Sequence, residues 1–386
     1  MNKNIQYKKL GEICDFISGG TPSKSKNEYW KNGNIPWIKI SDFKEKYIKF
    51  SDEKITKIGL ESSSAKILKK GTILYTIFAS VGKVAILDIE ATTNQAVVGI
   101  NLKEDNSIDK DFLYYFLCSI ENNIKKQARG VAQNNINISI LKNINIPILP
   151  MSFQKNIVKT LNKLENILDN LKQKKLLINF LNKSLFTTMF GDIEKKSEYH
   201  KLSNICDVRD GTHDSPEYIT TDKRFPLITS KNLKGDKIDF SEVNFISEAD
   251  FNKINVRSKV DIGDILMPMI GTIGNPIIVK IDKKFSIKNL ALIKFKNSQI
   301  INTFLKFLLL SDYFNLIISQ KNKGGTQKFL SLSDIRNFLI PIPPIELQNK
   351  FAERIEKIEK LKFEIEKSIE TAQNLYDSLI SKYFDN

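Results

Sequence analysis

The sequence predicts an α+β protein in which one mixed-β domain occurs twice and a long helix follows each copy. Three observations predict this fold class. The two halves of the chain match each other at a spacing of about 192 residues, which is too long for a solenoid repeat and suits a duplicated domain. Each half contains short stretches of alternating apolar and polar residues, which are typical of half-buried strands. Each half then ends in a proline-rich segment and a heptad pattern, which indicates a long helix with an apolar seam.

The composition is that of a basic globular protein. The chain has 386 residues, and 59 Lys and Arg against 44 Asp and Glu leave a formal net charge of +15. This excess favours a polyanionic partner, because each cation near a phosphate releases a condensed counterion. The cysteines are Cys14, Cys118 and Cys206, and their wide spacing argues against a disulfide framework and favours a reducing, cytoplasmic location. No apolar run is long enough to cross a bilayer, so we expect no membrane association.

The internal repeat keeps its order along both halves. The matched segments open with Leu-x-x-Ile-Cys-Asp, continue with a Gly-Thr pair, and close on Gly-x-x-Gln and Ile-Pro-Ile-x-Pro. We therefore expect two similar domains at residues 1–151 and 191–344. Long helices are expected at residues 152–190 and 345–386. The matched segments are 10–16 with 202–208, 20–21 with 211–212, 35–38 with 225–228, 71–74 with 263–266, 80–82 with 272–274, 112–116 with 304–308, 130–133 with 324–327 and 146–150 with 340–344.

Each copy is expected to combine strands with one helix. In the first copy, the alternating pattern predicts strands at 35–41, 72–78 and 96–102, with Gly and Pro marking the turns. Behind Asp109, which is suited to capping a helix, apolar residues recur at every fourth position over 112–124 and predict a helix. The stretch 304–318 repeats this helical pattern in the second copy. The two domains should therefore share one α+β fold.

The two long helices are predicted to pair as an antiparallel coiled coil that separates the domains, because each helix carries an apolar seam that needs a partner. Antiparallel packing relates the two copies by a pseudo-two-fold axis. Lys175 and Lys362 interrupt the seams, where a lysine sets the register or extends its charge to solvent. Contact with a partner subunit is the alternative for these two lysines. The residues predicted to pack the helix pair are Leu161, Leu164, Leu168, Leu171, Ile355, Ile358, Ile365 and Ile369.

The sequence lacks the usual catalytic and metal-binding motifs. The histidines are His200 and His213, and neither has the second His or the Cys pair that a metal site needs. No Gly-x-x-x-x-Gly-Lys-(Ser/Thr) phosphate loop occurs, and the Pro-Pro pair at 343–344 is not part of the (Asn/Asp)-Pro-Pro-aromatic segment expected of an aminomethyltransferase. The carboxylate-x-Lys triplet at 194–196 lies in a charged linker and is interpreted as chance. We therefore expect a non-catalytic protein with no metal or cofactor of its own.

The order of these motifs resembles a known family over essentially the whole chain. Two similar basic domains alternate with two long helices, and each domain closes on Gly-x-x-Gln, then Pro-x-x-Pro and a Gln at the helix start, Gln154 or Gln348. In this the chain resembles the specificity subunit of type I restriction-modification systems. The resemblance implies two target recognition domains that bind a split sequence in double-stranded DNA, with the helices as a ruler between the half-sites. It also implies partners: two modification (methyltransferase) subunits, which hold S-adenosylmethionine, and restriction (translocase) subunits.

Candidate DNA-contacting residues follow from comparing the two copies. Bases are read by Arg, Lys, Asn and Gln, whereas phosphates also accept contacts from Ser, Thr and backbone amides. Features common to both copies cannot distinguish two half-sites, so they suit turns or phosphate contacts. Sequence reading is expected where the copies diverge, around 24–26 and 41–49 in the first copy and around 213 and 231–237 in the second. The candidates are Lys24, Lys26, Lys39, Ser41, Lys44, Lys46, Lys83, Arg129, Gln133, Asn134, Thr212, His213, Lys231, Asn232, Lys234, Thr272, Lys323, Gln327 and Lys328.

Two other functions are compatible with the sequence. The chain is alternatively a non-enzymatic adaptor, in which two β domains bind proteins and the helices dimerise; DNA affinity without a steep fall with salt would favour it. A self-sufficient methyltransferase is the third possibility, and binding of the cofactor to the isolated chain would reveal it.

Overall fold

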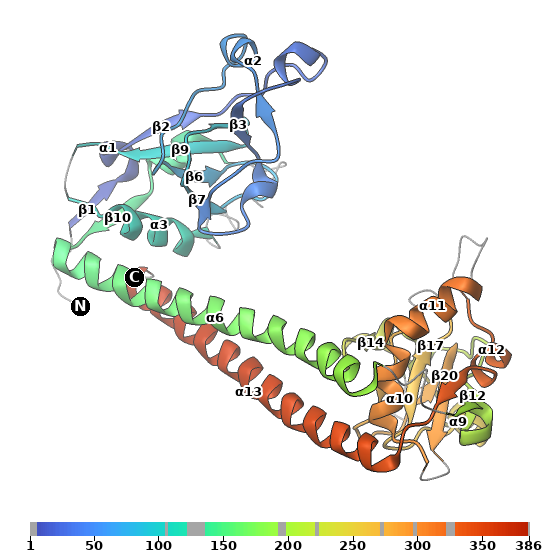
Figure 1. Ribbon diagram of the computed structural model, residues 1–386. Coiled ribbons are helices and arrows are strands. Elements are labelled where there is room, and N and C mark those ends of the chain that lie inside the picture. Colours follow the sequence, from blue (N-terminus) through green and yellow to red (C-terminus); the bar gives the residue numbers. More distant parts are fainter. Residues whose placement is uncertain are drawn as a thin grey trace. The chain divides into compact units, whose positions relative to one another are not determined.

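The chain folds into two compact units, each of which is described by itself. Unit 1 comprises residues 1–171 and 368–386, and unit 2 comprises residues 172–367. Each unit contains one mixed-β domain and parts of both long helices, so the α+β class with a duplicated domain is confirmed (Figure 1). The computed structural model describes residues 6–104, 107–121, 136–191, 198–220, 224–270, 274–295, 299–321 and 329–384.

The domain of unit 1 contains a larger and a smaller sheet, besides the pair of its first and last strands. Its strands are β2 (Cys14–Ser18), β3 (Ile35–Ile38), β4 (Tyr47–Ile48), β5 (Lys54–Ile55), β6 (Ile73–Thr76), β7 (Val84–Leu87), β8 (Thr92–Thr93) and β9 (Val97–Leu102). The larger sheet has the order β2-β9-β6-β7-β4, and its central strand β6 is buried throughout. The smaller sheet has the order β5-β3-β8, in which β3 and β8 run parallel.

The domain of unit 2 repeats this arrangement. Its strands are β12 (Cys206–Asp210), β13 (Arg224–Ile228), β14 (Leu233–Lys234), β15 (Lys237–Ile238), β16 (Asn244–Ser247), β17 (Ile265–Pro268), β18 (Ile277–Ile278), β19 (Ser286–Ile287) and β20 (Leu290–Phe295). One sheet has the order β12-β20-β17-β18, which matches β2-β9-β6-β7, and another has the order β16-β13-β19. Strands β13 and β19 run parallel, as β3 and β8 do. The β14 and β15 hairpin is a separate two-stranded sheet.

The first and last strands of each domain pair at the entrance to its long helix. In unit 1, β1 (Gln6–Lys9) is antiparallel to β10 (Asn145–Ile148), and in unit 2, β11 (Tyr199–Lys201) is antiparallel to β21 (Leu339–Pro341). The prolines that follow β10 and β21 cannot continue a strand ladder, so the chain turns into the helix there. Each domain is thereby closed where its helix begins.

Short helices complete both domains. In unit 1 they are α1 (Leu10–Ile13), α2 (Lys57–Glu61), α3 (Lys110–Ser119) and α5 (Ile138–Lys142), with 3-10 turns η1 (Asn27–Tyr29) and η2 (Ile40–Asp42). In unit 2 they are α8 (Leu202–Ile205), α9 (Glu248–Ser258), α10 (Asn302–Leu309), α11 (Asp312–Lys321) and α12 (Leu332–Arg336), with the 3-10 turn η3 (Ser230–Asn232). Helix α9 is not predicted from the sequence; Ser247 caps it by accepting a hydrogen bond from the backbone N–H of Asp250.

The helix expected after Asp109 is present as α3, whereas the single helix expected over 304–318 is two helices. The Asp109 carboxylate accepts hydrogen bonds from the first turn of α3, as predicted. In unit 2, α10 ends at Leu309 because the hydroxyl of Ser311 donates to the backbone oxygen of Leu308 at 2.6 Å. The same hydroxyl accepts from the N–H of Phe314, which opens α11. A serine that bonds to the backbone on both sides thus separates the two helices.

The long helices are α6 (Met151–Phe190) and α13 (Ile345–Phe384), each of 40 residues. Unit 1 contains the first half of α6 and the last part of α13, and unit 2 contains the second half of α6 and the first part of α13. Because the start of one helix lies with the end of the other, the helices run antiparallel within each unit. Of the predicted packing residues, Leu161, Leu164, Leu168, Ile355 and Ile365 are buried, and Leu171, Ile358 and Ile369 are half-buried. Lys175, at the break in the seam, pairs with Glu366 at 2.9 Å across the helix pair. This ion pair favours one register of the helices.

Two buried glutamines fix the domains to the helices. The side-chain oxygen of Gln154 accepts a hydrogen bond from the backbone N–H of Asp109 at 2.8 Å, and its amide nitrogen donates to the backbone oxygens of Ser107 and Leu149. Gln348 does the same in unit 2, accepting from the N–H of Ile301 at 2.9 Å. Both glutamines are fully buried. The glutamine shared by the two copies is therefore structural, because all its polar atoms are used in holding the cap of α3 or α10.

The hydrophobic core of each domain continues into the ends of the long helices. In unit 1, Phe384 at the end of α13 packs on Phe112 of α3, with ring centroids 5.2 Å apart. In unit 2, Phe190 at the end of α6 packs on Phe304 of α10 at 4.9 Å. The helix that follows one domain thus closes the core of the other domain, in both units alike.

Candidate nucleic-acid interface

In unit 1, a group of lysines surrounds aromatic rings in the loop after β2. The ammonium of Lys24 lies 3.6 Å from the ring centroid of Trp30 and 2.5 Å from Glu53. Lys39 also lies 2.5 Å from Glu53, and Lys26 donates to the hydroxyl of Tyr29 at 3.0 Å. Lys24 and Lys39 lower the pKa of Glu53 through their hydrogen bonds, so this carboxylate stays charged. The loop presents exposed cations in a fixed arrangement that suits contact with phosphates and base edges.

Four other candidates of unit 1 lie on exposed turns or at the helix contact. Ser41 and Lys44 are exposed on the segment that follows β3, and Lys83 is exposed after Gly82, whose φ is +97°. Lys46 instead faces the long helix: its side chain is only 13 % exposed and donates to Asn162 of α6 at 2.8 Å. We therefore do not propose Lys46 as a DNA contact.

In unit 2, the loop after β12 carries a polar network in place of the lysines. The ring of His213 bonds through Nε2 to Asp210 and through Nδ1 to Asn289, both at 2.9 Å. Arg257 of α9 forms an ion pair with the same Asp210. Thr212 accepts a hydrogen bond from the backbone N–H of Asp214, which shapes the loop.

A cavity of about 380 Å³ opens between this loop and α9. Lys253 and Arg257 line it opposite Thr212 and His213. These two α9 cations were missed by sequence reasoning, although their spacing of four residues behind a helix cap places them on one face. The structure thus adds an Arg and a Lys to the predicted Thr212 and His213.

The candidates at 231–234 are divided by their burial. Lys231 and Lys234 are exposed, and Lys234 pairs with Asp239 at 2.6 Å. Asn232 is only 6 % exposed, and its amide bonds to Thr229 and to the backbone oxygens of Asp239 and Glu242. Every polar atom of Asn232 is used in holding the turn, so we do not propose it as a base-reading residue.

The remaining candidates lie outside the described residues. They are Arg129, Gln133, Asn134, Thr272, Lys323, Gln327 and Lys328.

The chemistry of the remaining groups does not point to catalysis. Among the residues that the structure describes, no three His, Cys, Asp or Glu side chains come together as metal ligands. Burial raises the pKa of Cys14 and of Cys206 to about 12, so these thiols stay protonated and are poor nucleophiles. Within the same described ranges, no helix combines the length and apolarity needed to cross a membrane.

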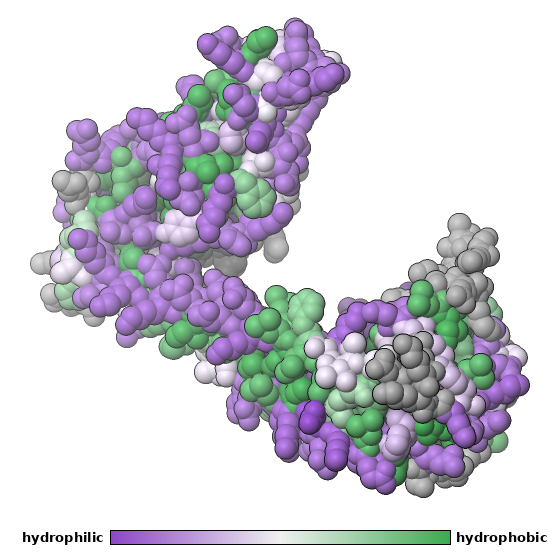
Figure 2. All heavy atoms as spheres, in the orientation of Figure 1, coloured by the Kyte–Doolittle hydropathy of each residue, from purple (hydrophilic) through white to green (hydrophobic). Residues whose placement is uncertain are grey.

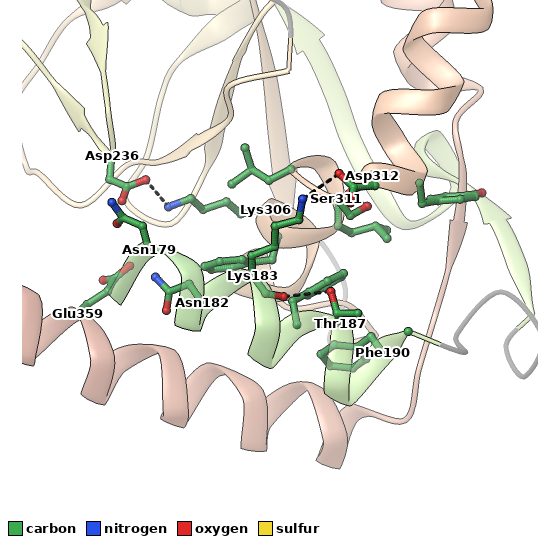
Figure 3. Close-up of a pocket in the computed structure, with 16 residues that line it drawn as sticks. Asn179, Asn182, Lys183, Thr187, Phe190, Asp236, Lys306, Ser311, Asp312 and Glu359 are labelled. Atoms are coloured by element: carbon green, nitrogen blue, oxygen red, sulfur yellow. Dashed lines mark hydrogen bonds and ion pairs between the residues drawn. The ribbon is translucent and has the colours of Figure 1, made fainter. Parts of the chain in front are cut away.

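A second cavity of about 380 Å³ lies in unit 2 between α6 and α10 (Figure 3). Its lining includes Phe186, Lys306 and Asn182, and the side-chain oxygen of Asn182 is buried without a hydrogen-bond partner in the structure. Asn182 holds the place in α6 that Tyr376 holds in α13. Tyr376 fills the matching space in unit 1 and donates to Glu165. The cavity therefore arises where a smaller side chain replaces a tyrosine.

The fold and these loops define a class of protein: one recognition scaffold present twice, with different side chains at matching positions, joined to a shared pair of helices. The profile of the type I restriction modification DNA specificity domain matches residues 2–179 and 194–372. The chain belongs to this family, as a specificity subunit of a type I restriction-modification system with two target recognition domains. Specificity subunits are non-catalytic recognition subunits, and the adaptor alternative is not favoured.

Individual relatives agree with this assignment. The chain is 26 % identical to the type I restriction enzyme MjaIX specificity subunit of Methanocaldococcus jannaschii, over 98 % of this chain and 92 % of that protein. It is 30 % identical to the EcoR124I/EcoR124II specificity subunit of Escherichia coli, over 44 % of this chain and 43 % of that protein. The S subunit of the type I restriction-modification system from M. genitalium has a similar fold, with a TM-score of 0.59, 20 % identity, and coverage of 99 % of this chain and 97 % of that chain.

A further solved structure has the same fold. It is a chain from work on complex assembly and conformational transition of the type I R-M system, with a TM-score of 0.62 and 16 % identity over 100 % of this chain and 98 % of that chain.

Proposed function

We propose that the two domains bind the two halves of a bipartite, non-palindromic sequence in double-stranded DNA. The observation that carries this proposal is the difference between matching loops on one scaffold. After β2 the loop presents Lys24 beside Trp30, whereas after β12 the matching loop presents His213, which together with Arg257 of α9 contacts the buried Asp210 at the end of β12. Two copies with the same framework and different exposed groups suit two different base sequences.

The long helices are proposed to set the distance between the half-sites. A 40-residue helix is about 60 Å long at about 1.5 Å per residue. One turn of DNA is about 34 to 36 Å, so a helix of this length is sufficient to place two domains more than one turn apart. The inter-helix ion pair of Lys175 and Glu366 supports a fixed register, which a ruler requires. Deleting about seven residues from each helix in register should change the spacer in the recognised sequence.

The chain is proposed to act with two modification subunits, which carry S-adenosylmethionine and transfer the methyl group, and with restriction subunits, all in the cytoplasm. An exposed apolar stretch of α6 is the proposed docking surface for a modification subunit. Leu176, Leu177 and Phe180 are 61 %, 65 % and 70 % exposed, and Leu181 lies beside them. Figure 2 shows hydrophobic residues gathered on this stretch of the helices. Exposed apolar surface of this kind is typical of protein interfaces.

Mapping of methylated adenines tests the proposed function. The chain is expressed with its modification subunit in a host that lacks other adenine methyltransferases. The expected result is one methylated motif with two specific parts and an unspecified spacer. A methylation pattern that does not depend on this chain, or a motif in one continuous block, would contradict the proposal. DNA affinity should also fall steeply with salt, because the contacts involve phosphates.

A further inference from the structure

Each domain meets the long helices through a charged residue at the same position of the repeat. Lys46 comes directly before β4, in the segment that follows η2, and Asp236 comes directly before β15, in the segment that follows η3. The two copies thus place a cation and an anion at one structural position.

In unit 1 the cation is surrounded by acceptors. Lys46 donates to Asn162 of α6 at 2.8 Å and to the hydroxyl of Tyr115 at 3.1 Å, and lies 3.7 Å from Glu165 of α6. The Tyr115 hydroxyl donates to Glu165 at 2.7 Å. Burial, and then the bond to Glu165, raises the pKa of Tyr115, so this hydroxyl stays a donor at all ordinary pH values.

In unit 2 the charges are reversed, because the residue at this position is an anion and its neighbours are cations. Asp236 accepts from Lys306 of α10 at 2.8 Å and from Lys362 of α13 at 3.4 Å, and Figure 3 shows the bond between Asp236 and Lys306. The side chain of Lys306 is only 4 % exposed. Burial favours the neutral form of Asp236, but Lys306 and Lys362 outweigh it and lower the pKa of the carboxyl below its ordinary value. A buried ammonium needs this counter-charge, because an unpaired buried charge is strongly destabilising.

We propose that Lys46 and Asp236 are positioning residues whose opposite charges make the two joints between domain and helix non-interchangeable. A lysine at the unit 2 position would face Lys306 and Lys362, and an aspartate at the unit 1 position would face Glu165 and Asp111. Like charges at such a joint are repulsive, so each joint accepts its own loop and rejects the other. A chain with two similar domains needs such a device, since the wrong domain otherwise fits the wrong helix ends. This inference concerns assembly and does not depend on DNA binding.

Charge reversal in the full-length chain tests the proposal. Asp236→Lys is expected to lower the urea midpoint of unfolding by about 1 M, and adding Lys362→Glu is expected to restore part of this loss. In unit 1, Lys46→Glu is expected to lower the midpoint, and adding Glu165→Lys to restore it in part. The matched control is Lys234→Glu, which reverses the charge of an exposed lysine of β14 that pairs with Asp239 and is expected to change the midpoint little.

An exchange variant examines the two joints together. Lys46→Asp with Asp236→Lys keeps the net charge but moves each residue to the other joint, and the two losses are expected to add. The proposal is wrong if this variant unfolds at the wild-type midpoint. It is also wrong if Lys234→Glu costs as much as Asp236→Lys, or if Lys362→Glu lowers the midpoint of the Asp236→Lys chain further. Asp236→Glu, which keeps the charge, should stay close to the wild type.

Discussion

Gln154 at the start of α6 accepts a hydrogen bond from the backbone N–H of Asp109 at 2.8 Å. Asp109 is the residue that caps α3, so the first turn of the long helix holds the cap of a helix inside the domain. Gln348 and Ile301 reproduce this relationship in unit 2. The position of each domain on its helix therefore depends on one buried amide.

Replacing Gln154 with alanine is expected to lower the free energy of unfolding of unit 1 by about 3 kcal/mol, because it removes the hydrogen bonds that this fully buried side chain makes with one backbone N–H and two backbone carbonyls. Urea denaturation measures the change. The control is Gln373→Ala, whose side chain bonds to Asp377 on the helix surface; it should cost less than about 0.5 kcal/mol. Equal losses from the two variants would contradict the structural role of Gln154.

Replacing Asn182 with tyrosine is expected to stabilise unit 2 by about 1 kcal/mol, because the ring fills a cavity and the variant removes a buried oxygen that lacks a partner. In unit 1 the matching Tyr376 donates to Glu165 at 3.2 Å. In unit 2 the matching Glu359 lines the cavity and pairs through one carboxylate oxygen with Lys280, so we expect the other oxygen to accept the same bond. Thermal denaturation measures the change, with Asn182→Ala as the control that enlarges the cavity. A lower melting temperature for the tyrosine variant would show that the cavity is not free to accept a ring.

The ion pair between Lys175 and Glu366 predicts a pH dependence of the helix pair. The hydrogen bond from Lys175 lowers the pKa of Glu366 below its ordinary value of 4.5. A lowered pKa of an acid means stability that is present above the ordinary pKa and is lost as the pH falls through the folded-state value. Both side chains are partly exposed, so the contribution is expected to be below about 1 kcal/mol. Urea midpoints at pH 7 and pH 3 should differ less in Glu366→Gln than in the wild type; an identical difference would exclude this pair as a cause.

Single substitutions in the loop after β2 and beside the loop after β12 should affect separate halves of the DNA target. Lys24→Ala is expected to relax or weaken one half-site only, and Arg257→Ala the other, by about 1–3 kcal/mol if a base contact is lost. If a phosphate contact is lost instead, the slope of the logarithm of DNA affinity against the logarithm of salt concentration should become shallower by about 1. Methylation mapping and salt-dependent DNA binding measure these effects. A loss spread equally over both half-sites would contradict the assignment of one loop to each half.

Much of the fold could be predicted from the sequence because the repeat and the periodic patterns are local signals. The apolar seam identifies both long helices, and the matching segments identify two domains of one fold. The break between α10 and α11 could not be predicted, since it depends on the hydroxyl of Ser311 bonding to the backbone of Leu308 within an apolar run. Helix α9 carries too few apolar residues to give a periodic signal.

The candidate site was less predictable than the fold, because the role of a polar residue depends on what surrounds it. Lys46 and Asn232 look like surface residues in the sequence, but one bonds to α6 and the other holds a turn. Arg257 joins the loop after β12 only through the packing of α9. Lys24 is exposed and Lys39 is half-buried, and the bonds that both make to Glu53 join residues that are distant in the sequence.

The packing of Phe190 on Phe304, and of Phe384 on Phe112, has a consequence for engineering and for natural recombination. A domain transferred from another protein with its ends at the proline-rich junctions would lack the phenylalanine, at the end of the other long helix, that completes its hydrophobic core. Crossovers placed midway along α6 and α13 would transfer each domain together with the helix end that packs on its core. Hybrids with new sequence preferences should therefore be soluble mainly when the crossovers lie there.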